Sequence, residues 1–130
     1  MNKDRVELFL AALESGKYTQ CKGRLRVHTE VRQYHCARGV ATEVALDTGL
    51  REELRTMGYN ADVFLFQGGR LEWHVMQWYG FDHPDPMLTE PVGPYQLVTT
   101  VSRLNDNDKD FWTIAQMGRE QWLKDQGEQS

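Results

Sequence analysis

Apolar residues near the N-terminus repeat with the period of a helix that buries one face. They stand at i, i+3, i+4 and i+7 and are Val6, Phe9, Leu10 and Leu13. This spacing puts four side chains on one stripe of an α-helix, and Gly16 follows as a residue that readily ends a helix. The pattern predicts a helix over residues 4–15.

The next segment changes to the alternating pattern of a half-buried β-hairpin. Residues 24–28 and 31–34 alternate in polarity on either side of Thr29 and Glu30, where the chain would turn. Such a hairpin places most of its basic side chains on one exposed face.

Helical spacing returns after the hairpin. Residues 36–47 are expected to form a second helix that buries Val40, Ala41 and Val44. Leu50, Leu54 and Met57 then repeat at i, i+4 and i+7, which indicates a short third helix over residues 50–57.

The middle of the chain is less regular. Residues 63–66 form a brief apolar run suited to a strand, and the glycine pair 68–69 indicates a turn. Periodicity alone leaves residues 71–79 between helix and strand. All four prolines fall within residues 84–94, so residues 82–95 are predicted to be an irregular connection.

The C-terminal part predicts one further helix. Its apolar stripe begins at Phe111, and the acidic cluster of residues 106–110 before it suits a helix N-terminus. The tail of residues 126–130 is expected to be disordered. With 130 residues and 15.1 kDa, the chain predicts a single compact α+β domain over residues 1–125, with four to five helices packed on a small β-hairpin.

The charge is unevenly distributed along the chain. The net formal charge is −4, yet the segment 16–40 holds six basic residues and one acid, a charge of +5 against −9 elsewhere. Such segregation can direct a field toward an anionic partner, whereas the acidic total argues against a general nucleic-acid coat or a membrane-surface protein.

Cysteine content and hydropathy favour an intracellular protein. Cys21 and Cys36 are too few for a disulfide framework, which suits a reducing compartment. No apolar run approaches a membrane span, and the charged start lacks the apolar core of a signal peptide.

Three short motifs are similar to those of a known protein family. They are L-E-S-G-K-Y-T-Q at residues 13–20, Y-H-C-A-R-G-V-A at residues 34–41, and L-N-D at residues 104–106 followed by Phe111, Ile114 and Ala115. Together they resemble a family of small, functionally uncharacterised proteins encoded mainly by tailed bacteriophages. The resemblance implies a phage protein acting in the host cytoplasm, and it favours helix for residues 71–79 with Gly80 after its end.

The chain differs from that family pattern at two of three cysteine positions. Cys36 keeps the middle one, whereas His35 and Thr42 occupy the others. The difference argues against a role that needs all three thiols, such as metal binding or disulfide exchange.

Cys36 is the candidate nucleophile. A thiol at a helix N-terminus beside Arg38 can have a lowered pKa, and His74 or His83 could act as its base in a cysteine-dependent hydrolase. The alternative is that Cys36 is a small buried residue packing the hairpin onto the helix. Catalysis is the less favoured of the two.

Neither a metal nor a cofactor is expected. His28, His35, Cys36 and His74 lack the paired spacing of known metal sites. A helix-turn-helix could be read from residues 97–104 followed by the helix at Phe111, but Asp106, Asp108 and Asp110 would oppose the phosphates of DNA. Nucleic-acid binding is therefore possible but not favoured.

The basic hairpin surface is the preferred candidate site. Guanidinium and ammonium groups can pair with phosphate while aromatic rings stack on a base. The candidate residues are Lys17, Tyr18, Lys22, Arg24, Arg26, Arg32, Tyr34, His35 and Arg38. We expect a non-catalytic accessory protein that binds a host protein or an anionic ligand, with host takeover or anti-defence as possible tasks. Trp73, Trp78, Tyr79 and Phe81 could belong to the core or to a protein interface.

Overall fold

The structure is a computed structural model that describes residues 1–21, 26–28, 33–60 and 70–124; for residues 26–28, 33, 34 and 70 it describes the backbone. The helices are α1 (Lys3–Glu14), α2 (Ala37–Ala45), η1 (Leu46–Leu50), α3 (Arg51–Thr56), α5 (Arg70–Tyr79), α6 (Val101–Asp106), α7 (Phe111–Gly118) and η2 (Arg119–Leu123). The strands are β1 (Thr19–Gln20), β2 (Arg26–His28), β3 (Gln33–His35), β4 (Met87–Val92) and β5 (Tyr95–Thr100). The fold is α+β, as the sequence predicts.

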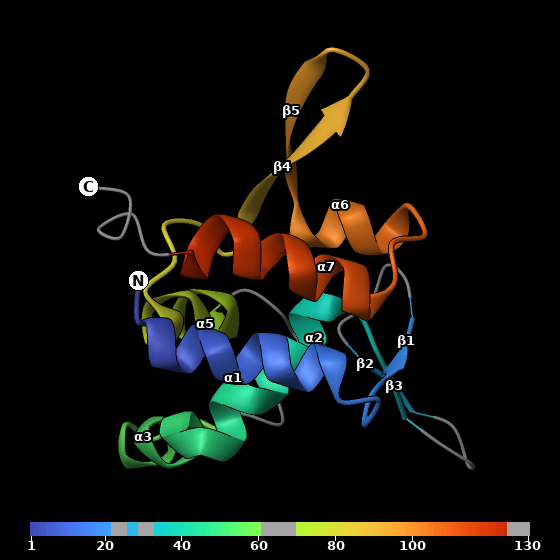
Figure 1. The fold of residues 1–130 in the computed structure, drawn as a ribbon. Helices are drawn as coiled ribbons and strands as arrows, with labels where there is room; N and C mark the ends of the chain where they lie inside the picture. Colours follow the sequence, from blue (N-terminus) through green and yellow to red (C-terminus); the bar gives the residue numbers. More distant parts are fainter. Residues whose placement is uncertain (22–25, 29–32, 61–69, 125–130) are drawn as a thin grey trace.

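Helix α1 lies at the centre of the helical body, between α7 and α2 (Figure 1). Asn2 caps its N-terminus, because the Asn2 Oδ1 atom accepts a hydrogen bond from the Arg5 backbone N–H at 3.1 Å. Its predicted apolar stripe is buried, and Gly16 has a φ of +77° just after the helix. This prediction is confirmed.

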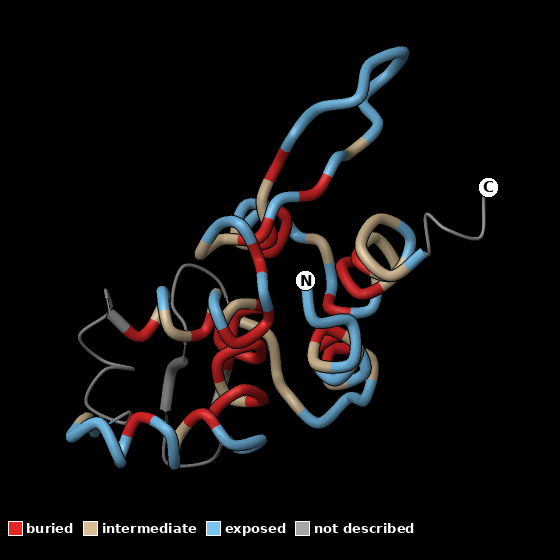
Figure 2. The backbone as a smooth tube through the Cα atoms, turned by 90° about the vertical axis from the view of Figure 1, so that its left-hand side faces the viewer, coloured by how far each residue is buried: buried red, intermediate tan, exposed pale blue. Residues whose placement is uncertain are grey.

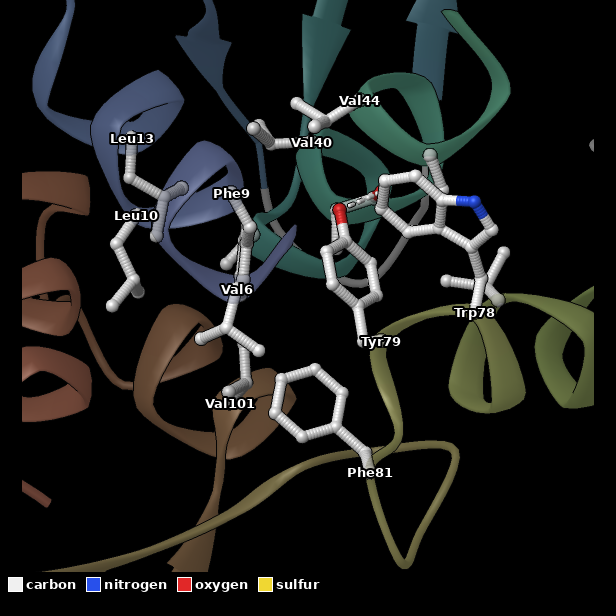
Figure 3. Packing of buried hydrophobic residues seen from close by; sticks show 14 of the residues in the cluster. Val6, Phe9, Leu10, Leu13, Val40, Val44, Trp78, Tyr79, Phe81 and Val101 are labelled. Carbon is white, nitrogen blue, oxygen red and sulfur yellow. Dashed lines mark hydrogen bonds between the residues drawn. The ribbon is translucent and has the colours of Figure 1, made fainter. Parts of the chain in front are cut away.

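The core is built around Tyr79 at the end of α5. Tyr79 is fully buried, and its hydroxyl donates a hydrogen bond to the Ala41 carbonyl of α2 at 2.5 Å. Its ring lies 5.8 Å from Phe9 of α1 and 5.4 Å from Phe81, measured between ring centroids. Figure 3 shows these rings together with Trp78. One aromatic side chain therefore joins α1, α2 and α5.

The predicted N-terminal hairpin strands are present within a three-stranded sheet. Strand β2 pairs antiparallel with β3 and places Arg26 opposite His35, whereas β1 pairs parallel with β3 on its other side. The sequence pattern did not predict β1. The strand predicted for residues 63–66, the turn at 68–69 and the tail 126–130 lie outside the described residues.

A second hairpin, β4 and β5, forms an arm that projects from the helical body (Figure 1) and is largely exposed beyond its base (Figure 2). The prediction that residues 82–95 are irregular is wrong for β4, and the helix read from residues 97–104 is a strand up to Thr100. Gly93, with a φ of +59°, and Pro94 form the turn in the glycine-first order of type II′ hairpins.

Pro91 does not interrupt the arm because its nitrogen faces away from β5. The neighbouring odd-numbered residue Thr89 bonds outward through both backbone groups to Gln121, and strand residues two apart face the same way. A proline whose missing N–H faces outward removes no ladder hydrogen bond. The proline rule that predicted an irregular segment therefore does not apply at this edge position.

The remaining helix predictions are confirmed. Helix α3 covers most of residues 50–57, α5 covers residues 71–79 with Gly80 after it at a φ of +78°, and α7 begins at Phe111 with Asp110 as its cap. Within the described part of the chain, no helix is both long and apolar enough to cross a membrane.

Candidate functional site

Two of the candidate basic residues lie at the β1–β3–β2 sheet: Lys17 precedes β1, and Arg26 lies on β2. Arg26 and Tyr34 lie on neighbouring strands one register position apart, and Lys17 and Tyr18 lead from α1 into β1. Lys22, Arg24 and Arg32 lie outside the described residues. We call the set Lys17, Lys22, Arg24, Arg26 and Arg32 the basic surface.

The Lys17 side chain lies over the ring of Tyr18, which packs against the ring of His35. The Lys17 Nζ atom lies 5.4 Å from the Tyr18 ring centroid, and Tyr18 meets His35 edge-on with 5.0 Å between ring centroids. His35 is buried, and its Nε2 atom lies 3.6 Å from a carboxylate oxygen of Glu43. Burial raises the pKa of the Tyr18 hydroxyl, helped by the carboxylates of Asp47 and Glu43. Tyr18 is half-buried beside the exposed Lys17, whereas His35 is buried beneath the Tyr18 ring.

A shallow groove of about 370 Å³ borders Lys17 between α1 and α2. Leu8 and Ala11 of α1 form its apolar wall, and Asp47 lies on the far side. The groove opens to solvent beside an exposed ammonium group, so a ligand held at Lys17 would meet both an apolar wall and a carboxylate.

Arg38 is held by acidic groups within the domain. Its Nη2 atom lies 2.9 Å from Oε1 of Glu72 on α5, and its Nε atom lies 4.0 Å from Oδ1 of Asp85 in the loop before β4. The Asp85 carboxylate also accepts a hydrogen bond from the Ser102 backbone N–H at 3.0 Å. Arg38 therefore connects three parts of the fold, and its charge is largely compensated.

The environment of the Cys36 thiol raises its pKa, whereas a nucleophilic cysteine needs a lowered pKa. Cys36 is the N-cap residue of α2 and is only 6% exposed. Burial raises its pKa, and this outweighs the hydrogen bonds from the Gly39 and Arg38 backbone. The candidate bases contact other residues: the His74 ring lies 5.9 Å from Tyr59, and the Asp85 backbone N–H donates to His83 Nδ1 at 3.2 Å.

We expect the Cys36 thiol to react slowly with an alkylating reagent at neutral pH. The half-buried Cys21 thiol should react at least about tenfold faster, because a buried thiol with a raised pKa reacts only when the structure opens. Iodoacetamide labelling followed by mass spectrometry measures the labelling rates of both thiols in one sample. In the Cys21→Ser variant, the labelling rate of Cys36 is measured alone. Rapid labelling of Cys36 in the folded protein would contradict this expectation.

The described hollows are either very small or widely open to solvent. An enclosed cavity beside Arg38 and Tyr79 has a volume of about 20 Å³, enough for one water molecule. Among the described residues, no group of three His, Cys, Asp or Glu side chains could hold a metal ion.

The region read as a helix-turn-helix carries acidic groups at its turn. Asp110 caps α7, since its Oδ1 atom accepts a hydrogen bond from the Thr113 backbone N–H at 2.7 Å. Asp106 and Asp108 are also exposed, as is Trp112 at 61%. Helix α7 packs against α1, so its start presents carboxylates rather than cations to solvent.

The four aromatic residues of the middle region divide between core and surface. Trp78, Tyr79 and Phe81 are buried, whereas Trp73 is 56% exposed on α5. The core interpretation holds for three of them, and Trp73 alone is available to a partner.

Asn105 is an organising residue that sequence reasoning missed. It is fully buried, and its Oδ1 atom accepts hydrogen bonds from Gln20 Nε2 at 2.9 Å and from the Ala37 backbone N–H at 3.1 Å. Its Nδ2 atom donates to the Cys21 carbonyl at 2.7 Å. The L-N-D motif contains this residue, but the three partners named here lie more than 60 positions away in the sequence.

The fold and these contacts define the class of protein: an α+β domain with an exposed Lys17 beside a small three-stranded sheet and a projecting β-arm. The chain belongs to the family described as a domain of unknown function, DUF8296, whose model matches residues 1–122. Comparison with curated proteins and with solved structures gave no match.

Proposed function

We propose that this protein is a non-catalytic binding protein that holds an anionic partner on its basic surface. The observation that carries the proposal is the segregation of charge, +5 over residues 16–40 in a chain whose net charge is −4. Segregated charge of this size focuses a field toward one side of a small domain and speeds the approach of an anion. The partner is a phosphate-bearing ligand or an acidic host protein.

The described contacts support this assignment. Lys17 is exposed at the end of α1, on a turn held by the hydrogen bond from its own backbone N–H to Ser15 Oγ at 3.1 Å. The Tyr18 ring beneath it restricts where the ammonium group can lie. Arg26, on β2, lies in the adjoining sheet, and arginine forks match phosphate and carboxylate geometry.

The biological setting we propose follows from the motif resemblance. A small accessory protein of a tailed bacteriophage, acting in the host cytoplasm, would meet host proteins and nucleotides as anionic partners. Host takeover or anti-defence would both suit a binding protein that needs no chemistry of its own.

The two alternatives are less well supported. A cysteine hydrolase would need a reactive Cys36, which burial opposes. DNA binding by α7 would need cations where Asp106, Asp108 and Asp110 stand. Binding through the basic surface requires neither.

The test of the proposal is charge reversal on the hairpin. The double variant Arg24→Glu, Arg26→Glu is expected to lose capture of its partner from infected host cells, identified by mass spectrometry of proteins and nucleotides. Its melting temperature should change little. A matched control, Arg55→Glu with Lys124→Glu, makes the same charge change at two exposed positions on α3 and after η2. Full capture by the hairpin variant, or equal loss in the control, would refute the proposal.

Salt dependence separates the kinds of partner. Affinity for a phosphate-rich ligand should fall steeply as salt rises from 50 to 200 mM, by roughly tenfold or more for every few phosphates contacted. Affinity for a protein held through Trp73 and other apolar groups should respond much less. Isothermal titration at several salt concentrations measures the slope.

A further inference from the structure

The two edges of the β4–β5 arm differ in whether they can accept another strand. On β4, the Trp122 indole N–H donates to the Met87 carbonyl at 3.0 Å, and Gln121 bonds both the N–H and the carbonyl of Thr89 at 2.7 and 2.8 Å. Pro91, the next outward-facing residue, has no N–H to offer. Side chains of η2 and a proline therefore block this edge along its length.

The outer edge of β5 has no such cover in the part of the chain that the structure describes. The register pairs Thr89 with Val98 and Pro91 with Gln96. Because the backbone groups of Thr89 point outward, those of Val98 and Gln96 must point outward on the opposite side, by the alternation of antiparallel ladders. No described residue has a hydrogen bond to either backbone amide. An exposed edge of this kind is a template for pairing with a further strand.

The outer part of the arm also exposes apolar side chains on both faces. Tyr95 is 68% exposed, Val98 60%, Leu97 51% and Val92 46%. In Figure 1 this part of the hairpin stands clear of the helices. A two-stranded ribbon alone is only marginally stable. A sheet of three or more strands with a hydrophobic face can be stable by itself. A further strand paired with β5 would therefore stabilise the arm.

We propose that β5 pairs antiparallel with β5 of a second copy of this chain, giving a four-stranded sheet in the order β4-β5-β5-β4. Two-fold symmetry is compatible with antiparallel pairing of a strand with itself. In the register with Val98 at the axis, the outward-facing residues Gln96 and Thr100 lie opposite each other. The outward backbone N–H and C=O groups of the two β5 strands then form hydrogen bonds with each other. The two β4 strands, whose outer edges are blocked, form the edges of the sheet.

The charge distribution favours a second copy as the occupant. Two chains of net charge −4 repel each other overall, and a surface with few charges keeps that repulsion low where the chains meet. The arm carries one charged residue, Glu90, whose carboxylate lies 3.4 Å from the Lys109 ammonium group. A basic or acidic partner would find no complementary charge on β5, whereas an identical neutral strand needs none.

The experiment combines solution mass with amide exchange. Analytical ultracentrifugation of the wild-type protein should show the mass doubling as concentration rises. Over the same range, hydrogen exchange by NMR should slow at the Gln96 and Val98 amides. The Thr89 amide, already bonded to Gln121, should exchange at a constant rate and reports that the arm is folded.

Two substitutions at one position test the edge itself. Val98→Pro removes the outward N–H without touching the bonds between β4 and β5 and should leave a monomer. Val98→Thr keeps the N–H and the branched shape and should still dimerise. A wild-type monomer at every concentration would overturn the proposal. So would a dimer with fast-exchanging Gln96 and Val98, or protection that appears only with a different protein.

Discussion

Replacing Asn105 by alanine is expected to destabilise the protein by about 3 kcal/mol. The substitution removes one fully buried side chain and, with it, the hydrogen bonds that Asn105 makes to three polar groups: the Gln20 amide, the Ala37 N–H and the Cys21 carbonyl. Each unsatisfied buried group is worth about 1–3 kcal/mol, although Gln20 keeps its bond to the Lys109 carbonyl. The loss falls on the junction of β1, α2 and α6.

Urea unfolding followed by circular dichroism measures this change in the free energy of unfolding. Asn107→Ala is the matched control, since Asn107 lies two residues away and is exposed, and its effect should stay within about 0.5 kcal/mol. Equal effects of the two substitutions would show that Asn105 does not organise the junction.

Replacing Arg119 by methionine is expected to destabilise the attachment of the C-terminal helix by about 1–2 kcal/mol at neutral pH. The Arg119 guanidinium contacts Glu7 and Glu14 of α1, with its Nε 2.9 Å from Oε2 and its Nη2 2.5 Å from Oε1 of Glu14. A bidentate arginine held by two carboxylates is among the stronger surface interactions, and solvent screening limits the figure because about a third of the guanidinium is exposed.

The stability difference between wild type and Arg119→Met should depend on pH. The hydrogen bond from Arg119 lowers the pKa of Glu14 below its ordinary value of 4.5. A carboxyl with a lowered folded-state pKa contributes stability above that ordinary value, and the contribution disappears as pH falls through the folded pKa. The difference should therefore be constant from pH 7 to about 5 and should shrink below 4.5.

Urea unfolding of both proteins between pH 3 and pH 7 measures this dependence. Arg55→Met is the control, because Arg55 pairs with Glu52 on an exposed turn of α3 and should leave the unfolding midpoint unchanged at every pH. A difference that stays the same at pH 3 would show that Arg119 acts through packing alone.

The proposed binding surface and the proposed arm interface lie on different parts of the fold. The β1–β3–β2 sheet and the β4–β5 arm share no strand. In sequence, the segment of the first sheet is rich in basic residues, whereas the arm carries one charged residue, Glu90. A dimer joined at β5 would present two basic surfaces to one partner, which would raise avidity if the partner is itself repeated.

Local sequence patterns predicted the structure correctly where interactions between residues a few positions apart decide it. The stripe at Val6, Phe9, Leu10 and Leu13 defines α1, and Gly80 ends α5, because helical spacing and left-handed glycine act within a few residues. At β4 a local pattern failed, because the prolines predicted an irregular segment where the structure has a strand. Whether Pro91 breaks a strand depends on which side its nitrogen faces, and the pairing of Thr89 with Gln121 decides that from 32 positions away.

The candidate site also combines features that the sequence shows with features that only the folded structure shows. Charge segregation over residues 16–40 can be read from composition, and it remains the basis of the proposed function. Composition could not reveal that Arg38 is paired with Glu72 and Asp85, or that burial raises the pKa of Cys36, because both depend on groups distant in the chain.

By itself the sequence determined the α+β class, most of the helices and the concentration of positive charge on one hairpin, since periodicity, capping and charge are local properties. Only the tertiary structure decided that Arg38 is compensated, that Asn105 joins three elements, and that β5 keeps an open edge while β4 does not. The physical reason is that pairing and burial depend on residues brought together by folding, and these lie tens of positions apart in the chain.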